Sequence, residues 1–184
     1  MSSLRVRCGP WTAAAVLLAL LSSGAARAQI IIGQSPEAQC NRIVTADVVA
    51  FDQVFFWNRL GAVQPQGMMY ALRRDVVPIS GNTLSPGNVQ LRPGKRPRPM
   101  VLRVNVGDCL RIEFQNLLSP SRRDQEQPAT RWASVHVVGM QPFTIQDDGS
   151  FVGRNTTSLV DVGQSITYSL MAPDREGEHV LYSA

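Results

Sequence analysis

The amino-acid sequence predicts an all-β fold on three observations. Apolar residues alternate with polar ones along residues 100–106 and again along residues 110–115, which is the period of a half-buried strand. Turn-forming residues separate such stretches at intervals of roughly 8–12 residues, a spacing typical of sandwiches and barrels. No long stretch repeats its apolar residues at the helical period of about 3.6. We therefore expect strands packed in a β-sandwich or a barrel.

Residues 100–118 are the centre of this prediction. A Gly107-Asp108 pair interrupts the alternation, which indicates a tight turn or bulge between two strands. Each strand offers one face to the core and the other to water, so Arg103, Arg111 and Glu113 are expected to be exposed. The residues expected in the core are Leu102, Val104, Leu110, Ile112, Phe114, Val135, Val137, Tyr168 and Leu170.

The other elements follow from composition. Strands are predicted where β-branched and aromatic residues gather, in residues 43–57 (with a break after 52–53), 134–138, 165–171 and 178–182. Loops or turns are predicted where Pro, Gly or charges gather, in residues 58–67, 78–99, 119–131, 147–149 and 173–177. The composition of residues 68–77 allows a helical turn.

The N-terminus has the three parts of a secretory signal peptide. Arg5 and Arg7 precede an apolar run over residues 11–21, and the small residues around Ala28 suit a cleavage site. The run is shorter than the ~20 residues that cross a bilayer as a helix. We expect cleavage after Ala28, an exported protein in the periplasm or outside the cell, and no membrane attachment afterwards. Residues 29–184 would form one domain, with a leader over 29–42 and a core from about residue 43.

Charge excludes some partners. The whole chain carries a formal charge of +4, and the signal peptide holds three arginines and no acid, which leaves +1 for the mature chain. A nearly neutral chain gives no general case for binding nucleic acid or an acidic membrane. Residues 92–99 form a local basic stretch, but their prolines favour an extended, solvated connector.

Two cysteines remain in the mature chain. Cys8 leaves with the signal peptide, while Cys40 and Cys109 stay. In an exported protein such a pair is more often a disulfide than part of a metal site. A bridge that closes a loop of this length stabilises the fold by about 4 kcal/mol in the chain-entropy model.

Three groups of residues resemble the cupredoxin domains of multicopper oxidases. The first group is Pro99, Val104, Gly107, Asp108, Ile112, Phe114, Asn116 and Leu118; the others are HVVG at residues 136–139 and REGEHVLYS at residues 175–183. Residues 55–77 are similar to the N-terminal domains of large bacterial multicopper oxidase-like proteins. The resemblance implies a cupredoxin-like Greek-key β-sandwich with a strand within residues 68–77. It also implies that the last strand or strands of that sandwich are missing.

The ligand motifs of that family are altered here. The family has His-x-His-Gly where this chain has His136, Val138 and Gly139, so the second histidine is replaced. The family's second motif, Trp-Tyr-His-x-His, falls on Tyr182 and its neighbours, and neither register puts a histidine there. We therefore expect no copper ligand, no catalytic residue and no cofactor in this chain, and copper only in the parent protein. His136 is then expected to hydrogen-bond a neighbour.

The sequence lacks the residues that several other kinds of metal, nucleotide or catalytic site require. A blue-copper site needs two histidines and a cysteine on one metal, whereas the chain has only His136 and His179, and Cys109 opens an early strand. There is no P-loop, no GxGxxG and no nucleophile elbow. Asp147-Asp148-Gly149 lacks the rest of a calcium loop and is interpreted as a turn.

Three functions remain open. The first is an N-terminal domain with a structural or docking role in a multicopper oxidase-type protein, where its partners are the other cupredoxin domains of a longer chain. The intact protein would use dioxygen to oxidise a substrate or metal ion, while this domain alone would not be catalytic. The second is a free-standing secreted β-sandwich that binds a partner. The third is a degenerate copper-binding module that uses His136.

Overall fold

A computed structural model describes residues 36–121, 129–150, 153 and 157–184. All of these residues belong to one compact unit, Gln34–Ala184. The predicted signal peptide, residues 1–28, lies outside the described residues, as does most of the predicted leader.

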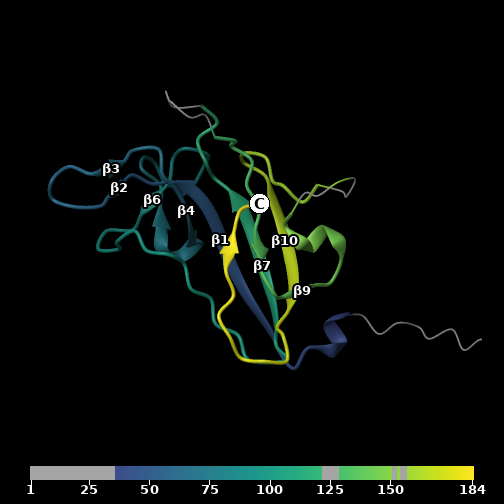
Figure 1. Cartoon of the computed structure of the whole chain (residues 1–184). Helices are drawn as coiled ribbons and strands as arrows, with labels where there is room; N and C mark the ends of the chain where they lie inside the picture. Colours follow the sequence, from purple (N-terminus) through teal and green to yellow (C-terminus); the bar gives the residue numbers. More distant parts are fainter. Residues whose placement is uncertain (1–35, 122–128, 151–152, 154–156) are drawn as a thin grey trace, which may run out of the picture. The chain divides into compact units, whose positions relative to one another are not determined.

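The main element is a five-stranded sheet with the order β4-β1-β7-β10-β9. Its strands are β1 (Ile43–Asp52), β4 (Met68–Leu72), β7 (Cys109–Asn116), β9 (Gln141–Pro142) and β10 (Ser165–Met171). Neighbouring strands are antiparallel except β1 and β7, which run parallel with Ile43 opposite Cys109. β1, β7 and β10 lie side by side in Figure 1. Residues 68–77 begin with the strand β4, which the resemblance implies, and continue into a 3₁₀ turn, Arg73–Asp75, which their composition allows.

The remaining elements are short. They are η1 (Pro36–Gln39), β2 (Phe55–Phe56), β3 (Val63–Gln64), η2 (Arg73–Asp75), β5 (Val76–Val77), β6 (Gln90–Leu91), β8 (His136–Val137), η3 (Ile145–Asp148) and β11 (Leu181–Tyr182). β2 pairs with β3, β5 with β6, and β8 with β11. Only three-residue and four-residue 3₁₀ turns interrupt the strands and loops of the described residues, so the prediction of an all-β fold is confirmed.

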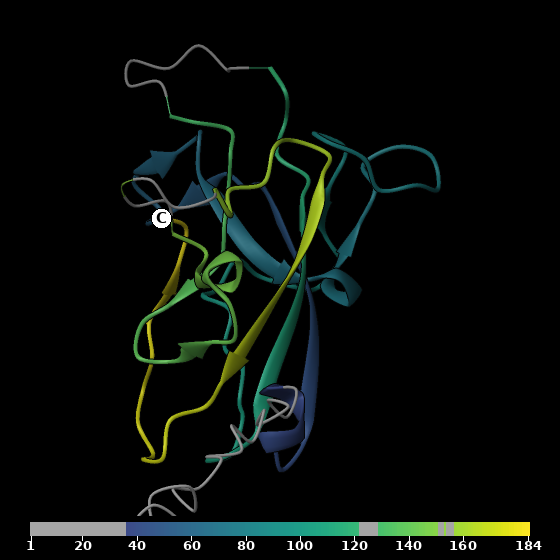
Figure 2. The same ribbon diagram turned by 90° about the vertical axis from the view of Figure 1, so that its right-hand side faces the viewer.

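The core lies on one face of the five-stranded sheet. Leu110, Ile112 and Phe114 alternate along β7 and are buried there together, as their period of two predicts. Val135 and Val137 pack against them from the β8 side. β8 and its partner β11 form a second layer of strands over this core. In Figure 2 the short yellow arrow of β11 stands apart from the long strands. Two layers of strands therefore enclose one core, as in a sandwich.

A smaller apolar cluster covers one end of the opposite face. It consists of Val49, Phe51, Ala71, Val76, Val89 and Leu117. Residues 76–91, which include the β5–β6 pair, contribute to it. The proline-rich residues 78–99 were predicted to lack regular structure. Within them only Gln90 and Leu91 form a strand, β6.

Residues 100–106 differ from the prediction. Residues 100–105 form no strand, because no described segment pairs with them, and Val106 already belongs to the following turn. Leu102 and Val104 are half-buried, whereas both were expected in the core. The side chains of residues 100–105 still alternate between half-buried and exposed, so the apolar pattern correctly predicts which of them face the core but not a hydrogen-bonded partner strand.

The turn that follows is built as its residues predict. The backbone N–H of Asp108 donates to the carbonyl oxygen of Asn105 (3.1 Å), and Gly107 supplies the positive φ of 76°. The Asp108 carboxylate accepts hydrogen bonds from Arg42 (2.7 Å) and from the Asn105 backbone N–H (3.1 Å). The Arg42 guanidinium, followed by that N–H, holds the pKa of Asp108 below its ordinary value.

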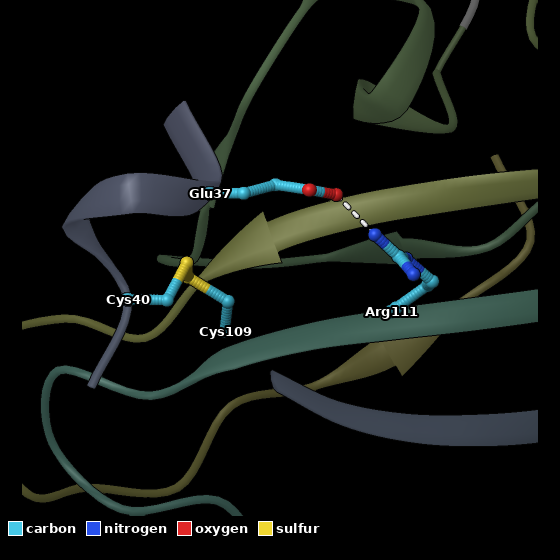
Figure 3. Close-up of a disulfide and its surroundings, with 4 residues drawn as sticks. All are labelled: Glu37, Cys40, Cys109 and Arg111. Carbon is cyan, nitrogen blue, oxygen red and sulfur yellow. Dashed lines mark hydrogen bonds and ion pairs between the residues drawn. A yellow bond between two sulfur atoms is a disulfide. The ribbon is translucent and has the colours of Figure 1, made fainter. Parts of the chain in front are cut away.

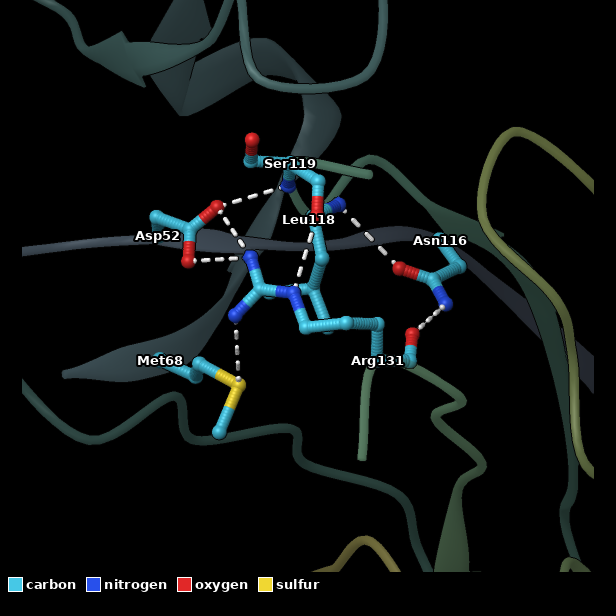
Figure 4. Close-up of polar contacts among 6 residues, drawn as sticks. All are labelled: Asp52, Met68, Asn116, Leu118, Ser119 and Arg131. Atoms are coloured by element: carbon cyan, nitrogen blue, oxygen red, sulfur yellow. Dashed lines mark hydrogen bonds and ion pairs between the residues drawn. The ribbon is translucent and has the colours of Figure 1, made fainter. Parts of the chain in front are cut away.

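A buried polar network closes the other end of the sheet (Figure 4). Arg131 Nη2 lies 2.6 and 2.7 Å from the two carboxylate oxygens of Asp52, and both side chains are less than a tenth exposed. Arg131 Nε donates to the Ser119 carbonyl oxygen, and the Ser119 N–H donates to Asp52. The Asn116 side chain donates to the carbonyl oxygens of Arg131 and Val160. These bonds satisfy the charged pair and fix residues 116–119 against β1.

Candidate functional site

The β8–β11 ladder joins the two stretches that resemble ligand motifs. Tyr182 lies opposite His136, and the N–H of Val138 donates to the carbonyl oxygen of Val180 (3.0 Å). Val137 is buried in the core, so the residues before and after it, His136 and Val138, face away from the core. The outer face of the ladder therefore presents one imidazole, one phenol and two valines.

His136 is held in a fixed orientation. Its Nδ1 lies 2.6 Å from the backbone carbonyl oxygen of Asp148 and 3.2 Å from the Asp148 carboxylate. Its ring packs edge-on against the Tyr182 ring at 5.2 Å between centroids. A carbonyl oxygen only accepts, so Nδ1 carries the proton of the neutral ring, and Nε2 is the nitrogen able to accept a hydrogen bond or bind a metal. The expected hydrogen bond from this imidazole to a neighbour is present.

The sequence around η3 places that carbonyl. The Asp147 carboxylate accepts the N–H of Thr144 (3.0 Å) and the N–H of Ser169 (2.8 Å), which ties η3 to β10. Gly149 follows with a φ of 71°, and a Cβ there would lie 1.9 Å from the Val135 carbonyl oxygen. Residues 147–149, predicted as a simple turn, thus end a short 3₁₀ helix. The Asp147 carboxylate serves as its cap.

His179 makes a separate contact. Its Nδ1 lies 2.7 Å from the Val138 carbonyl oxygen, and its ring lies over Gly139, where a Cβ would come within 2.8 Å of that nitrogen. His136 and His179 therefore bond to different carbonyl groups. Among the described residues, no three or more His, Cys, Asp or Glu side chains gather in a way that could hold a metal ion.

Ser134 and Tyr70 support the ladder from behind. The Tyr70 hydroxyl donates to the Ser134 carbonyl oxygen (2.5 Å), and burial raises the pKa of that phenol to about 12. The Ser134 N–H donates to Ser183 Oγ, and the N–H of Ala184 donates to Ser134 Oγ, both at 3.1 Å. Sequence reasoning missed both residues, because a serine and a tyrosine in apolar stretches give no signal of their partners.

The predicted disulfide is present between Cys40 and Cys109 (Figure 3). The two Cα atoms are 5.5 Å apart, and the bond spans 69 residues of sequence. Figure 3 shows Glu37 of η1 bonded to Arg111 beside it. Arg111 is therefore partly covered, although it was expected to be exposed. Together these contacts attach the segment before β1 to the start of β7.

No protein-family model matches the chain, and no curated protein matches it either. Within the described ranges, no helix is both long enough and apolar enough to cross a membrane.

Proposed function

We propose that this chain is an exported cupredoxin-like domain of a multicopper oxidase-type protein, and that the copper ligands of the family are largely replaced in it. The observation that carries the proposal is the β8–β11 ladder. The two stretches that resemble the family's ligand motifs lie far apart in sequence, yet they pair as neighbouring strands, with Tyr182 opposite His136. Copper ligands on two such strands would converge on one face, and here that face keeps a single histidine.

The sheet order supports the Greek-key part of the proposal. β1 pairs with β4 on one side and, in parallel, with β7 on the other. Parallel neighbours in an all-β protein require a connection that crosses between layers, since a tight hairpin joins only antiparallel strands. Residues 53–108, which include β4, make that connection here, and a Greek-key sandwich needs one of this kind.

The disulfide supports export. Disulfides persist in oxidising compartments and are rare where thiols are kept reduced. The Cys40–Cys109 bond therefore agrees with a signal peptide over residues 1–28 and with a protein that matures in the periplasm or outside the cell.

The role that fits these features is structural or docking. Copper chemistry with dioxygen would belong to other domains of the intact protein, with which this domain packs. A metal site needs several ligands held in fixed geometry, and the outer face of the ladder offers Val138 and Val180 at the positions beside His136 and Tyr182. Valine cannot bind a metal.

The test restores the missing ligands. The protein is dialysed against Cu(II), and bound copper is measured in the wild type, in His136→Ala and in Val138→His/Tyr182→His. We expect no stoichiometric copper in the first two and one copper in the double variant, lost again when His136→Ala is added. One tight copper in the wild type that His136→Ala abolishes would instead support the degenerate copper module. A double variant that binds no more copper than the wild type would show that the motif alignment is wrong.

One observation favours the second function, a free-standing binding module. The β2–β3 hairpin exposes Phe56 (77%), Trp57 (68%) and Leu60 (95%). Phe55 stacks on Trp57 at 5.6 Å, which stiffens this apolar surface. A gene that continues past residue 184 with His-x-His and His-Cys-His motifs would decide for the oxidase. Binding of a purified partner that Trp57→Ala abolishes, in a chain without such motifs, would decide for the module.

A further inference from the structure

Residues 100–104 behave like a strand without a neighbour. Met100, Leu102 and Val104 are half-buried and pack against the core, whereas Val101, 71% exposed, and Arg103 point outward. None of the described residues hydrogen-bonds to the backbone N–H or C=O groups of this stretch. Extended backbone whose polar groups are unpaired is an open edge that another strand can join.

The sequence limits the length of this edge. Pro97 and Pro99 have no N–H group, so the uninterrupted run of backbone N–H groups begins at Met100. At the other end, the backbone N–H of Asn105 is already bonded to Asp108, and its carbonyl oxygen belongs to the turn. Five residues remain, which is the length of a typical strand of about 5–6 residues.

The charges around the edge have one sign. No Asp or Glu occurs between Asp75 and Asp108, while this interval contains five Lys or Arg residues. Lys95 is paired with Asp75 at 2.9 Å. Arg96, Arg98 and Arg103 have no ion-pair partner among the described residues. Opposite charges stabilise cross-strand pairs and like charges destabilise them, so the edge favours an acidic strand and disfavours a basic one.

We propose that residues 100–104 are the acceptor edge for an extended peptide strand that alternates apolar and acidic residues. The main chain of the peptide would pair with the unpaired backbone groups, which is the interaction that gives affinity in strand addition. Its apolar side chains would extend the inner layer beside Met100 and Leu102, and its acidic side chains would lie beside Arg103.

The test uses the full chain and three capped synthetic peptides. The first is Glu-Val-Glu-Val-Glu-Val, the second has lysine in place of glutamate, and the third is the glutamate peptide N-methylated at every residue, which blocks backbone pairing along both of its edges. Fluorescence anisotropy of labelled peptides measures the affinity, and hydrogen exchange locates the bound strand. We expect the glutamate peptide to bind at least about tenfold more tightly than the other two. Added salt should weaken this binding, and the amides of residues 100–104 should exchange more slowly in the complex.

A charge reversal makes the test specific. Arg103→Glu should lower the affinity for the glutamate peptide and raise that for the lysine peptide. Arg59→Glu changes an exposed arginine of the β2–β3 loop, for which no contact with residues 92–104 is seen, and should leave both affinities nearly unchanged. Equal binding of the glutamate and lysine peptides, binding that survives N-methylation, or protection that falls on β11 or the β2–β3 hairpin would each overturn the proposal. So would sedimentation showing that two copies of the chain dimerise through residues 100–104.

Discussion

Replacing Arg131 by methionine should destabilise the fold by about 3–5 kcal/mol, the usual cost of removing one partner of a buried ion pair. The side chains of Arg131 and Asp52 are 8% and 7% exposed. Methionine has a similar length, so the change mainly removes the charge and its hydrogen bonds. The Asp52 carboxylate would then keep the Ser119 N–H as its donor (2.7 Å) while remaining out of water.

The chain offers a matched control on its surface. Arg111 and Glu37 also form an ion pair, but their side chains are 35% and 46% exposed. Water screens such a pair, so Arg111→Met should cost less than about 1 kcal/mol. The same substitution at two ion pairs therefore isolates the effect of burial.

Urea unfolding at pH 7, followed by tryptophan fluorescence, measures both changes in the free energy of unfolding. A double variant, Asp52→Leu/Arg131→Met, removes both charges and should cost less than Arg131→Met alone, because no unpaired carboxylate remains. The double variant also keeps the test valid if Arg131→Met fails to fold. A cost for Arg131→Met no greater than that for Arg111→Met would show that burial of the Asp52 carboxylate does not set the loss of stability.

Three further predictions concern the core, the disulfide and alkaline pH. Phe114→Ala should cost about 3–5 kcal/mol in the same urea assay, whereas Phe56→Ala on the exposed hairpin should cost less than about 0.5; similar losses would contradict the strand register. Mass spectrometry after alkylation without reductant should find Cys40 and Cys109 unmodified, and two alkylated thiols would disprove the bond. Burial raises the pKa of Tyr70 from 10.0 to about 12, so the unfolded state loses this proton first. Between pH 10 and 12, ionisation of this tyrosine in the unfolded state should lower the free energy of unfolding by up to about 1.4 kcal/mol per pH unit. Tyr70→Phe should reduce that slope, and an unchanged slope would rule the contribution out.

The strands that lie inside the sheet could be predicted from sequence. Leu110, Ile112 and Phe114 alternate with polar residues because one face of β7 is buried, so the pattern and the burial have the same cause. The same alternation over residues 100–104 predicts which side chains are half-buried. It could not predict hydrogen bonding, because a side-chain pattern carries no information about whether a neighbouring strand is present.

The polar parts of the fold could not be predicted in this way. Arg131 ends a charged loop and looks solvated in the sequence, yet it is buried against Asp52, 79 residues away. At the candidate site, the motif comparison selected His136 and Tyr182, which the ladder does bring together. The backbone carbonyl group of Asp148 orients that imidazole. A motif could not select it, because every residue type supplies the same carbonyl group.

The parallel pairing of β1 with β7 has a consequence for how the chain folds. Strands so distant in sequence meet only after a long loop closes, and non-local pairing of this kind slows folding. The disulfide links Cys40, three residues before β1, to the first residue of β7, so an oxidised chain begins folding with that 69-residue loop already closed. It also holds the two strands near their native register before either is buried. The oxidised chain should therefore reach the native state faster than the reduced chain, which makes the compartment that forms the bond also the one in which the sheet assembles efficiently.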